Sequence, residues 1–264
     1  MTLSYPNVKE LALSPDRLHK IELELHNVLN TYSIVRRVLR VVRSEDKIKR
    51  SPERFHKIGF DNLTDKIWFV DGVFGDRSFS VQGIGSSYAQ EIARAETSEL
   101  LKGLKTSGVD ENPIRVGGEL LSLEHILTAR NSLHNRGFNA DVVLANVRDH
   151  VYLWRYPGYR MEDGKTYLRV NSRTDLLVEF APEIPPGVSY VIDREHFGAF
   201  VIKEDLTLSL NEITPEERSK LLARVPDLRP DKLDEMVRIL IYEVVRVDID
   251  NPSAAIVLNR SLIG

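Results

Sequence analysis

The chain has 264 residues, of which 42% are hydrophobic and 28% are charged, a composition typical of a globular protein with a sizeable core. It contains no cysteine, which excludes disulfides, thiolate catalysis and cysteine metal sites. No apolar run approaches the roughly 18 residues that a membrane-spanning helix needs.

The net charge of -3 is unevenly distributed along the chain. Residues 1–60 hold 12 Lys and Arg against 7 Asp and Glu, whereas residues 61–264 hold 24 against 32. The basic excess is greatest between residues 34 and 57, and two interpretations of it stay open. It is either a solvated charged face or a segment that contacts a polyanion without sequence preference, because clustered Lys and Arg release counterions from phosphate. The candidate nucleic-acid-facing residues are Arg36, Arg37, Arg40 and Arg43.

The first 110 residues predict two helices, a hairpin and one ambiguous segment. Ser14-Pro15 is a helix start, with an N-cap followed by proline at the first helical position. Residues 33–43 fit a helix by spacing and a strand by their β-branched residues, so both assignments stay open. Residues 66–82 predict a hairpin around Asp71-Gly72, and a capping-box pattern predicts a helix that begins at Ser87 and fades between residues 103 and 108.

The stretch from residue 122 to residue 157 predicts a helix, a strand and a second helix. Ser122 is the expected N-cap of the first helix, and Gly137 is its left-handed stop. Residues 140–144 form a short apolar run, the pattern of a strand covered on both faces. Asn146 is the expected N-cap of the second helix, which ends at Pro157. The apolar residues of that second helix are Val147, Val151 and Trp154.

The remainder of the chain predicts strands drawn from distant parts of the sequence. The expected strands are residues 166–170, 175–180, 188–193, 199–202, 237–248 and 254–258. A polar helical insert is expected at residues 214–236, interrupted by two prolines. Together with the helices, these strands predict a mixed α+β protein.

Nothing in the sequence supports a catalytic, cofactor or metal site. The seven histidines are scattered without metal-ligand spacing, and neither a nucleophile elbow nor a Walker loop is present. Gly83 and Gly85 begin a dinucleotide-like pattern, but Tyr88 stands where the third glycine or alanine is needed. Asp248 and Asp250 lie two apart on an expected strand, which more often marks a solvent-facing strand end. We therefore expect no enzyme activity, no cofactor and no metal.

The order of the segments resembles the major capsid fold of tailed bacteriophages, the Hong Kong 97-type fold, which encapsulins also use. Residues 127–138 (LTARNSLHNRGF) and 140–154 (ADVVLANVRDHVYLW) resemble the helix, strand and helix of its axial domain. Residues 89–108 are similar to its long spine helix, and residues 190–210 to the strand pair that follows the axial domain. Residues 237–259 are similar to its closing strands.

The resemblance implies an α+β fold in five parts. These are an N-terminal arm or helix (1–33), an extended loop and hairpin (34–85), a spine helix with peripheral domain (86–121), an axial domain (122–200), and closing strands (201–264) with the helical insert 214–236. Two features depart from the family pattern. The insert splits the closing strands, and the extended loop is poorly defined.

The resemblance also implies a function and partners. We expect a self-assembling icosahedral shell subunit, most concretely the major capsid protein of a tailed double-stranded DNA virus, located in the virion head. Its partners would be copies of itself, as pentamers and possibly hexamers, and double-stranded DNA held by non-specific electrostatic contact, with no membrane. The alternative is an encapsulin, a cytoplasmic nanocompartment shell that encloses a cargo enzyme. A third, less favoured alternative is an enzyme that shares only the α+β plan.

Overall fold

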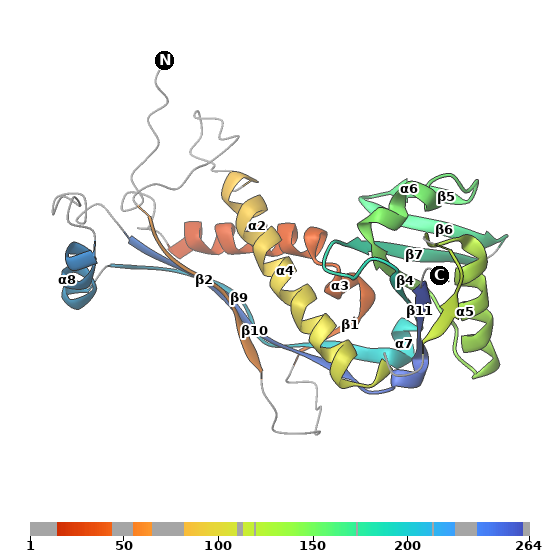
Figure 1. Ribbon diagram of the computed structural model, residues 1–264. Coiled ribbons are helices and arrows are strands. Elements are labelled where there is room, and N and C mark those ends of the chain that lie inside the picture. Colours follow the sequence, from red (N-terminus) through yellow and green to blue (C-terminus); the bar gives the residue numbers. More distant parts are fainter. Residues whose placement is uncertain are drawn as a thin grey trace, which may run out of the picture. The chain divides into compact units, whose positions relative to one another are not determined.

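The computed structural model describes residues 15–43, 55–64, 82–109, 113–118, 120–172, 174–212, 214–224 and 237–260 (Figure 1). The chain divides into two compact units, each built from separate stretches of sequence. Unit one comprises residues 1–32, 53–95 and 203–245, and unit two comprises residues 33–52, 96–202 and 246–264.

Unit two contains a seven-stranded mixed sheet with the order β3-β11-β8-β4-β7-β6-β5. Its strands are β3 (Ile114–Val116), β4 (Val142–Asn146), β5 (Tyr159–Glu162), β6 (Lys165–Asn171), β7 (Thr174–Ala181), β8 (Val188–Ile192) and β11 (Ala255–Arg260). The central strand β4 pairs parallel with β7 and antiparallel with β8, and all five of its residues are buried. The expectation of a strand covered on both faces is therefore confirmed, with its bounds two residues further along the chain.

The helices on either side of β4 begin as their caps predict. In helix α5 (Leu123–Asn135), the Ser122 hydroxyl accepts a hydrogen bond from the backbone N–H of His125, and the His125 ring in turn accepts one from the backbone N–H of Ser122. Gly137 ends the helix with φ +87°. After β4, the Asn146 side chain accepts from the N–H of Arg148 at the start of the short helices η2 (Val147–Asp149) and α6 (His150–Leu153).

Four further short segments complete unit two. They are the helices α3 (Val35–Val38), α7 (Arg194–Phe197) and η3 (Pro252–Ala254) and the strand β1 (Arg40–Arg43). The open question about residues 33–43 is thus answered both ways, since a helical turn is followed by a strand. Strand β1 pairs parallel with the first residues of β9 (Gly198–Glu212), in the register Arg40 to Ala199 through Arg43 to Ile202.

Unit one is built on helix α2 (Pro15–Tyr32) and a long antiparallel strand pair. Strand β2 (His56–Thr64) pairs with β10 (Val237–Ile249) from Thr64 opposite Val237 to His56 opposite Val245. Gly59 is required by this pairing, because a Cβ there would lie 2.0 Å from the Ile241 carbonyl oxygen. The four-stranded sheet has the order β1-β9-β10-β2, and β9 and β10 each contribute residues to both units.

Some sequence expectations are corrected, and others fall outside the described residues. Helix α4 (Gln82–Thr106) begins five residues before the expected start at Ser87, so the predicted hairpin does not extend to Gln82, and the rest of that hairpin lies outside the described residues. The polar insert begins with helix α8 (Pro215–Arg224), and its remainder is likewise outside them. The α+β class is confirmed, whereas the five-part division of the chain stays a prediction.

Candidate interaction surface

An exposed apolar face lies on η2 and α6 in unit two. Val147, Val151 and Trp154 are spaced by four and three residues, so a helix places them on one side. Trp154 is 58% exposed and Val151 51%, whereas Leu153 of the same helix is fully buried. Tyr152 is also exposed, with the guanidinium of Arg155 over its ring. Clustered exposed apolar side chains of this size are typical of an interaction site.

Buried polar contacts fix this face to the rest of the unit. The Asp149 carboxylate, at the end of η2, pairs with Arg260 of β11 at 2.8 Å and accepts a hydrogen bond from the backbone N–H of Leu121 at 3.0 Å. The Asn146 side chain donates to the carbonyl of Ile184. Because the ion pair is shielded from water, loss of either charged partner would leave the other buried and uncompensated. The exposed apolar residues therefore sit on a rigid support.

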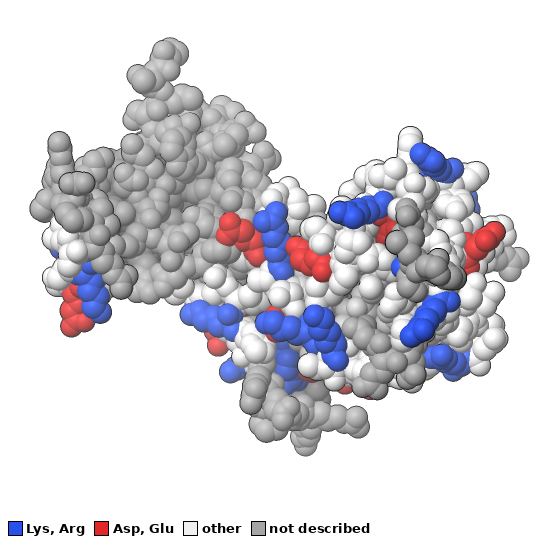
Figure 2. All heavy atoms as spheres, viewed as in Figure 1, with Lys and Arg blue, Asp and Glu red and all other residues white. Residues whose placement is uncertain are grey.

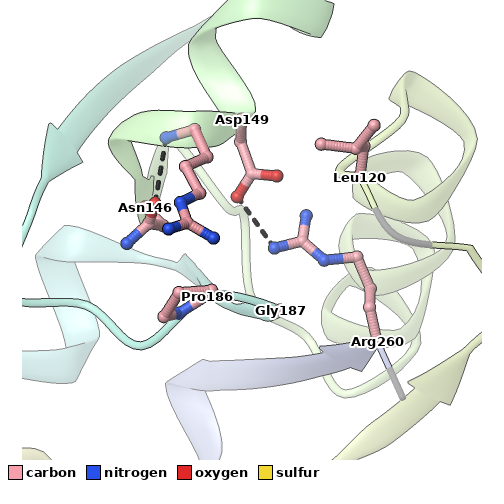
Figure 3. Close-up of a pocket in the computed structure, with 7 residues that line it drawn as sticks. Leu120, Asn146, Asp149, Pro186, Gly187 and Arg260 are labelled. Atoms are coloured by element: carbon pink, nitrogen blue, oxygen red, sulfur yellow. Dashed lines mark hydrogen bonds and ion pairs between the residues drawn. The ribbon is translucent and has the colours of Figure 1, made fainter. Parts of the chain in front are cut away.

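A pocket of about 360 Å³ lies beside this face (Figure 3). Its lining residues are Leu120, Asn146, Arg148, Asp149, Pro186, Gly187 and Arg260. Asp149 and Arg260 point toward one another across it, and Gly187, at φ +83°, accepts a hydrogen bond from the backbone N–H of Arg260. The pocket thus carries two guanidinium groups and one carboxylate, a formal excess of one positive charge.

The two guanidinium groups of the pocket are not fully paired within the chain. The Arg260 side chain is completely buried, yet its Nε and Nη1 have no hydrogen-bond partner among the described residues. Arg148 is exposed, and no acidic side chain in the described part of the chain pairs with it. Arginine stays protonated in proteins, so both groups keep their charge. The arrangement suits an anionic group brought from outside the chain.

A second exposed feature of unit two is the hairpin of β5 and β6. Asp163 and Gly164 form its two-residue turn, with φ values of +50° and +71°, as a type I′ turn requires. Met161, just before the turn, is 67% exposed, and Glu162 and Asp163 are exposed beside it. The base of the hairpin is held by Asp175, which pairs with Arg160 at 2.9 Å and with Arg169 at 3.1 Å. The hydrogen bond from Arg169, together with the nearby Arg160 charge, lowers the pKa of Asp175.

The four arginines predicted to face nucleic acid lie in two different environments. Arg36 pairs with Glu96 at 2.8 Å, and this carboxylate, completely buried, also accepts a hydrogen bond from Ser33. Arg37 makes two hydrogen bonds to Glu179, at 2.5 and 2.7 Å. Arg40 and Arg43 are exposed on β1. The charges of Arg36 and Arg37 are therefore largely compensated inside unit two, and a nucleic-acid role for these residues stays a prediction.

A carboxylate cluster near the start of α7 joins β4 to β8. Burial alone would raise the pKa of Asp193, but hydrogen bonds from the Asn139 N–H and from the backbone and ring of His196 lower it overall. Burial raises the pKa of Asp141, although Arg194 contacts it at 3.2 Å and partly opposes the rise. These contacts are structural, since each group is satisfied by partners of the same unit.

Two other kinds of feature are absent from the described part of the chain. No group of three or more His, Asp or Glu side chains that could hold a metal occurs there. No helix of the same residues is long and apolar enough to span a membrane. On the face shown in Figure 2, Lys and Arg lie at several separate places with Asp and Glu between some of them.

Sequence reasoning missed the pocket residues Arg148, Asp149 and Arg260. None of them belongs to a recognisable motif, and Asp149 and Arg260 are 111 residues apart. It did identify Val147, Val151 and Trp154 as the apolar side of a helix, but not that this side is exposed. What distinguishes Arg260 is its burial near the end of the last strand, and burial cannot be deduced from a single sequence.

Solved structures from phages and from a capsid are similar to most of the chain. The structure of Mycobacterium phage Adephagia aligns with a TM-score of 0.53 and 11% identity, over 88% of this chain and 91% of the other. That of Mycobacterium phage Cain gives a TM-score of 0.50 and 10% identity over the same shares. A capsid of a native GTA particle gives 0.50 and 11%, over 88% of this chain and 90% of the other.

These similarities are visible in structure and not in sequence. No family model matches the chain, and no curated protein is significantly similar to it in sequence. The resemblance to the Hong Kong 97-type fold is nevertheless confirmed, because the matching chains align over nearly their full length. The GTA structure is that of a capsid, and the other two come from phages.

Proposed function

We propose that the chain is a self-assembling subunit of an icosahedral shell, and most concretely the major capsid protein of a tailed double-stranded DNA virus. The observation that carries the proposal is the exposed apolar face of η2 and α6, held by buried contacts in a chain whose fold is similar to that of a capsid structure. A shell subunit needs such a face, since it buries part of its surface against copies of itself.

The energetics of the exposed face favour association. Trp154, Val151 and Val147 keep roughly half of their surface in water. Complete burial of an apolar side chain contributes about 1.5–3 kcal/mol of favourable free energy. Because these side chains are only half buried in the subunit, a substantial part of that free energy is still to be gained when a partner covers them. Aromatic anchors such as Trp and Tyr often dominate interface energies. Repeated over every subunit of a closed shell, this contact becomes a strong driving force.

Packaged DNA is the proposed content of the shell, and Arg40 and Arg43 are the proposed contacts. Both are exposed on β1, and both belong to the basic stretch of residues 34–57. Phosphate contacts by surface arginines are non-specific and weaken as salt concentration rises. Arg36 and Arg37 contribute by holding this segment in place through Glu96 and Glu179. By this proposal the protein resides in the virion head.

The experiment is electron microscopy of the purified protein, with absorbance at 260 and 280 nm recorded on the same fraction. We expect closed particles of uniform size that contain nucleic acid. An Arg40→Gln/Arg43→Gln variant should still form particles but release nucleic acid at lower salt. The matched control is Arg136→Gln, an exposed arginine outside β1 and outside the apolar face, which should leave the salt dependence unchanged.

Each contrary outcome points to a different conclusion. A monomer or dimer under all assembly conditions would contradict the shell function. Particles that stay free of nucleic acid and fill only with a co-expressed enzyme would contradict the viral assignment in favour of the encapsulin alternative. Nucleic acid retained equally well by the Arg40→Gln/Arg43→Gln variant would remove β1 from the contact.

A further inference from the structure

We propose that the pocket lined by Arg148 and Arg260 receives the Asp163 carboxylate from the β5–β6 hairpin of a second copy of this chain. The inference rests on the proposed shell function and names the contact that joins neighbouring subunits. The pocket is the receiving site and Asp163 is the inserted group, and neither follows from the exposed apolar face alone.

The pocket has a net positive charge that a carboxylate would neutralise. Its two guanidinium groups and the Asp149 carboxylate leave one positive charge, which a single carboxylate neutralises. Arg260 is completely buried with Nε and Nη1 unpaired among the described residues, and Arg148 lies exposed on η2. Because both guanidinium groups stay charged and only one carboxylate faces them, the residual positive field favours an incoming anion.

The β5–β6 hairpin has the complementary chemistry. Asp163 stands at the tip of a tight turn, is exposed, and forms no ion pair with any described residue. Glu162 adds a second negative charge beside it, already 3.7 Å from Arg160. Met161, 67% exposed, gives the hairpin an apolar side. The hairpin thus presents a carboxylate next to an apolar side chain.

The receiving surface carries the opposite charge and also has an apolar area beside it. Arg148 belongs to the same helical turn as Val147, so the cationic pocket lies next to the apolar face of η2 and α6. An incoming hairpin would place Asp163 against the arginines and Met161 against Val147 or Val151. Electrostatic complementarity of this kind fixes the register of two surfaces more than it adds affinity.

The hairpin and the pocket lie on the same chain, which favours a second copy over an unrelated partner. The inserted and receiving surfaces are different parts of one unit, so each copy can give its hairpin to the next copy in a heterologous contact. Heterologous contacts repeat from copy to copy and close into rings when the rotation between copies allows it. A rigid two-residue turn suits this role, because little conformational entropy is lost when it is inserted.

The test is a charge exchange in the full-length chain. Arg148→Glu and Asp163→Lys are made singly and together, and the fraction of protein in particles is measured by sedimentation velocity over a concentration series. Each single exchange should raise the concentration needed for assembly by about tenfold or more, since it places like charges together. The double exchange should restore assembly to within about threefold of the unaltered chain.

Two controls separate this contact from general effects of charge and folding. Arg136→Glu inverts an exposed arginine outside both the pocket and the apolar face, and it should leave the assembly concentration unchanged. Asp163→Asn removes the charge but keeps a residue that tolerates the left-handed turn, so it should weaken assembly without loss of folding. Circular dichroism of each variant establishes that the subunit is folded.

The outcomes are distinguishable from failure of the shell function. If the unaltered chain forms no particles, the shell function itself is wrong. If it does, but the single exchanges assemble equally well or the double exchange restores nothing, the hairpin is not the occupant of the pocket. If Arg148→Glu particles form normally but lose nucleic acid, the pocket binds phosphate and the proposed contact is overturned.

Discussion

Two helical segments of unit two, α5 and η2 with α6, both carry apolar residues at helical spacing but differ in what covers them. In α5, Ile126, Ala129 and Leu133 are fully buried in the core. In η2 and α6, the apolar residues Val147, Val151 and Trp154 remain exposed, and Leu153 alone is buried. Both segments begin at well-formed caps and flank the same strand β4.

An apolar helical face in a sequence therefore indicates a surface that will be covered, but it does not indicate which chain covers it. For α5 the cover is the sheet of the same unit, with β8 and β11 against it. For η2 and α6 no described part of unit two fulfils that role. We infer that another subunit does.

The largest expected loss of stability follows Asp149→Ala. This change leaves the Arg260 guanidinium buried without its partner and removes the acceptor of the Leu121 N–H. Loss of one partner of a buried ion pair typically costs about 3–5 kcal/mol. Urea unfolding of the dissociated subunit, followed by circular dichroism, should show that decrease in the free energy of unfolding.

The matched control for Asp149 is Asp163→Asn, a carboxylate change at an exposed turn. It should alter the free energy of unfolding by less than about 0.5 kcal/mol. Equal losses for the two variants would show that the ion pair does not anchor η2.

The next largest effect is expected for Leu133→Ala in α5. Leu133 is completely buried, so its truncation opens a cavity in the core and should cost about 2–5 kcal/mol of unfolding free energy. The corresponding change on the other segment, Val151→Ala, should cost under about 0.5 kcal/mol in the dissociated subunit. Similar losses at both positions would remove the distinction between the two segments.

A smaller effect is expected for the cap of α5. Ser122→Ala removes the acceptor for the His125 N–H and should cost about 1 kcal/mol. The measurement is again urea unfolding of the dissociated subunit. A change below about 0.3 kcal/mol would mean that the cap contributes little in this context.

The same cap carries a dependence on pH. Burial, and then the charge of Arg260, lower the pKa of His125 below its ordinary value of 6.5. The neutral ring is therefore favoured in the folded state, and its Nδ1 accepts from the Ser122 N–H. This contribution to stability is present above pH 6.5 and is lost as the pH falls below it.

His125→Gln tests this dependence, because glutamine completes a capping box without titrating. The variant should lose less stability than the unaltered chain between pH 7.5 and pH 5, with urea midpoints compared at each pH. An identical pH dependence in both proteins would contradict a role for His125 titration.

Much of this contrast was within reach of sequence reasoning, and part of it was not. Ser122, Gly137 and Asn146 act through contacts with residues one to five positions away, so their caps were predicted correctly. The start of α4 was placed five residues too late, because glycine is a weak helix former and yet Gly83 and Gly85 lie within the helix.

The candidate site depended on information that one sequence does not carry. The exposure of Trp154 and the pairing of Asp149 with Arg260 arise from tertiary contacts across 111 residues. The same limit affected the basic segment. The excess of Lys and Arg in residues 34–57 is visible in the sequence. The pairing of Arg36 and Arg37 with Glu96 and Glu179, which lie far away in the sequence, is not.

The smallest effect on subunit stability, and the most direct test of the account, concerns Trp154. Trp154→Ala should change the unfolding free energy of the dissociated subunit by less than about 0.5 kcal/mol, because more than half of the side chain is already in water. The same variant should assemble poorly, since it removes the largest apolar side chain of the exposed face. Normal assembly of Trp154→Ala would exclude this residue as an anchor.

The decisive measurement is hydroxyl-radical footprinting of the unaltered chain, with oxidation at Trp154 and Val151 quantified by mass spectrometry in assembled and dissociated protein. Leu133, buried in both states, serves as the internal reference. We expect strong oxidation of Trp154 and Val151 in the dissociated subunit, and several-fold less oxidation of both residues in the assembled protein. Equal oxidation in assembled and dissociated protein would contradict the claim that another subunit covers this face.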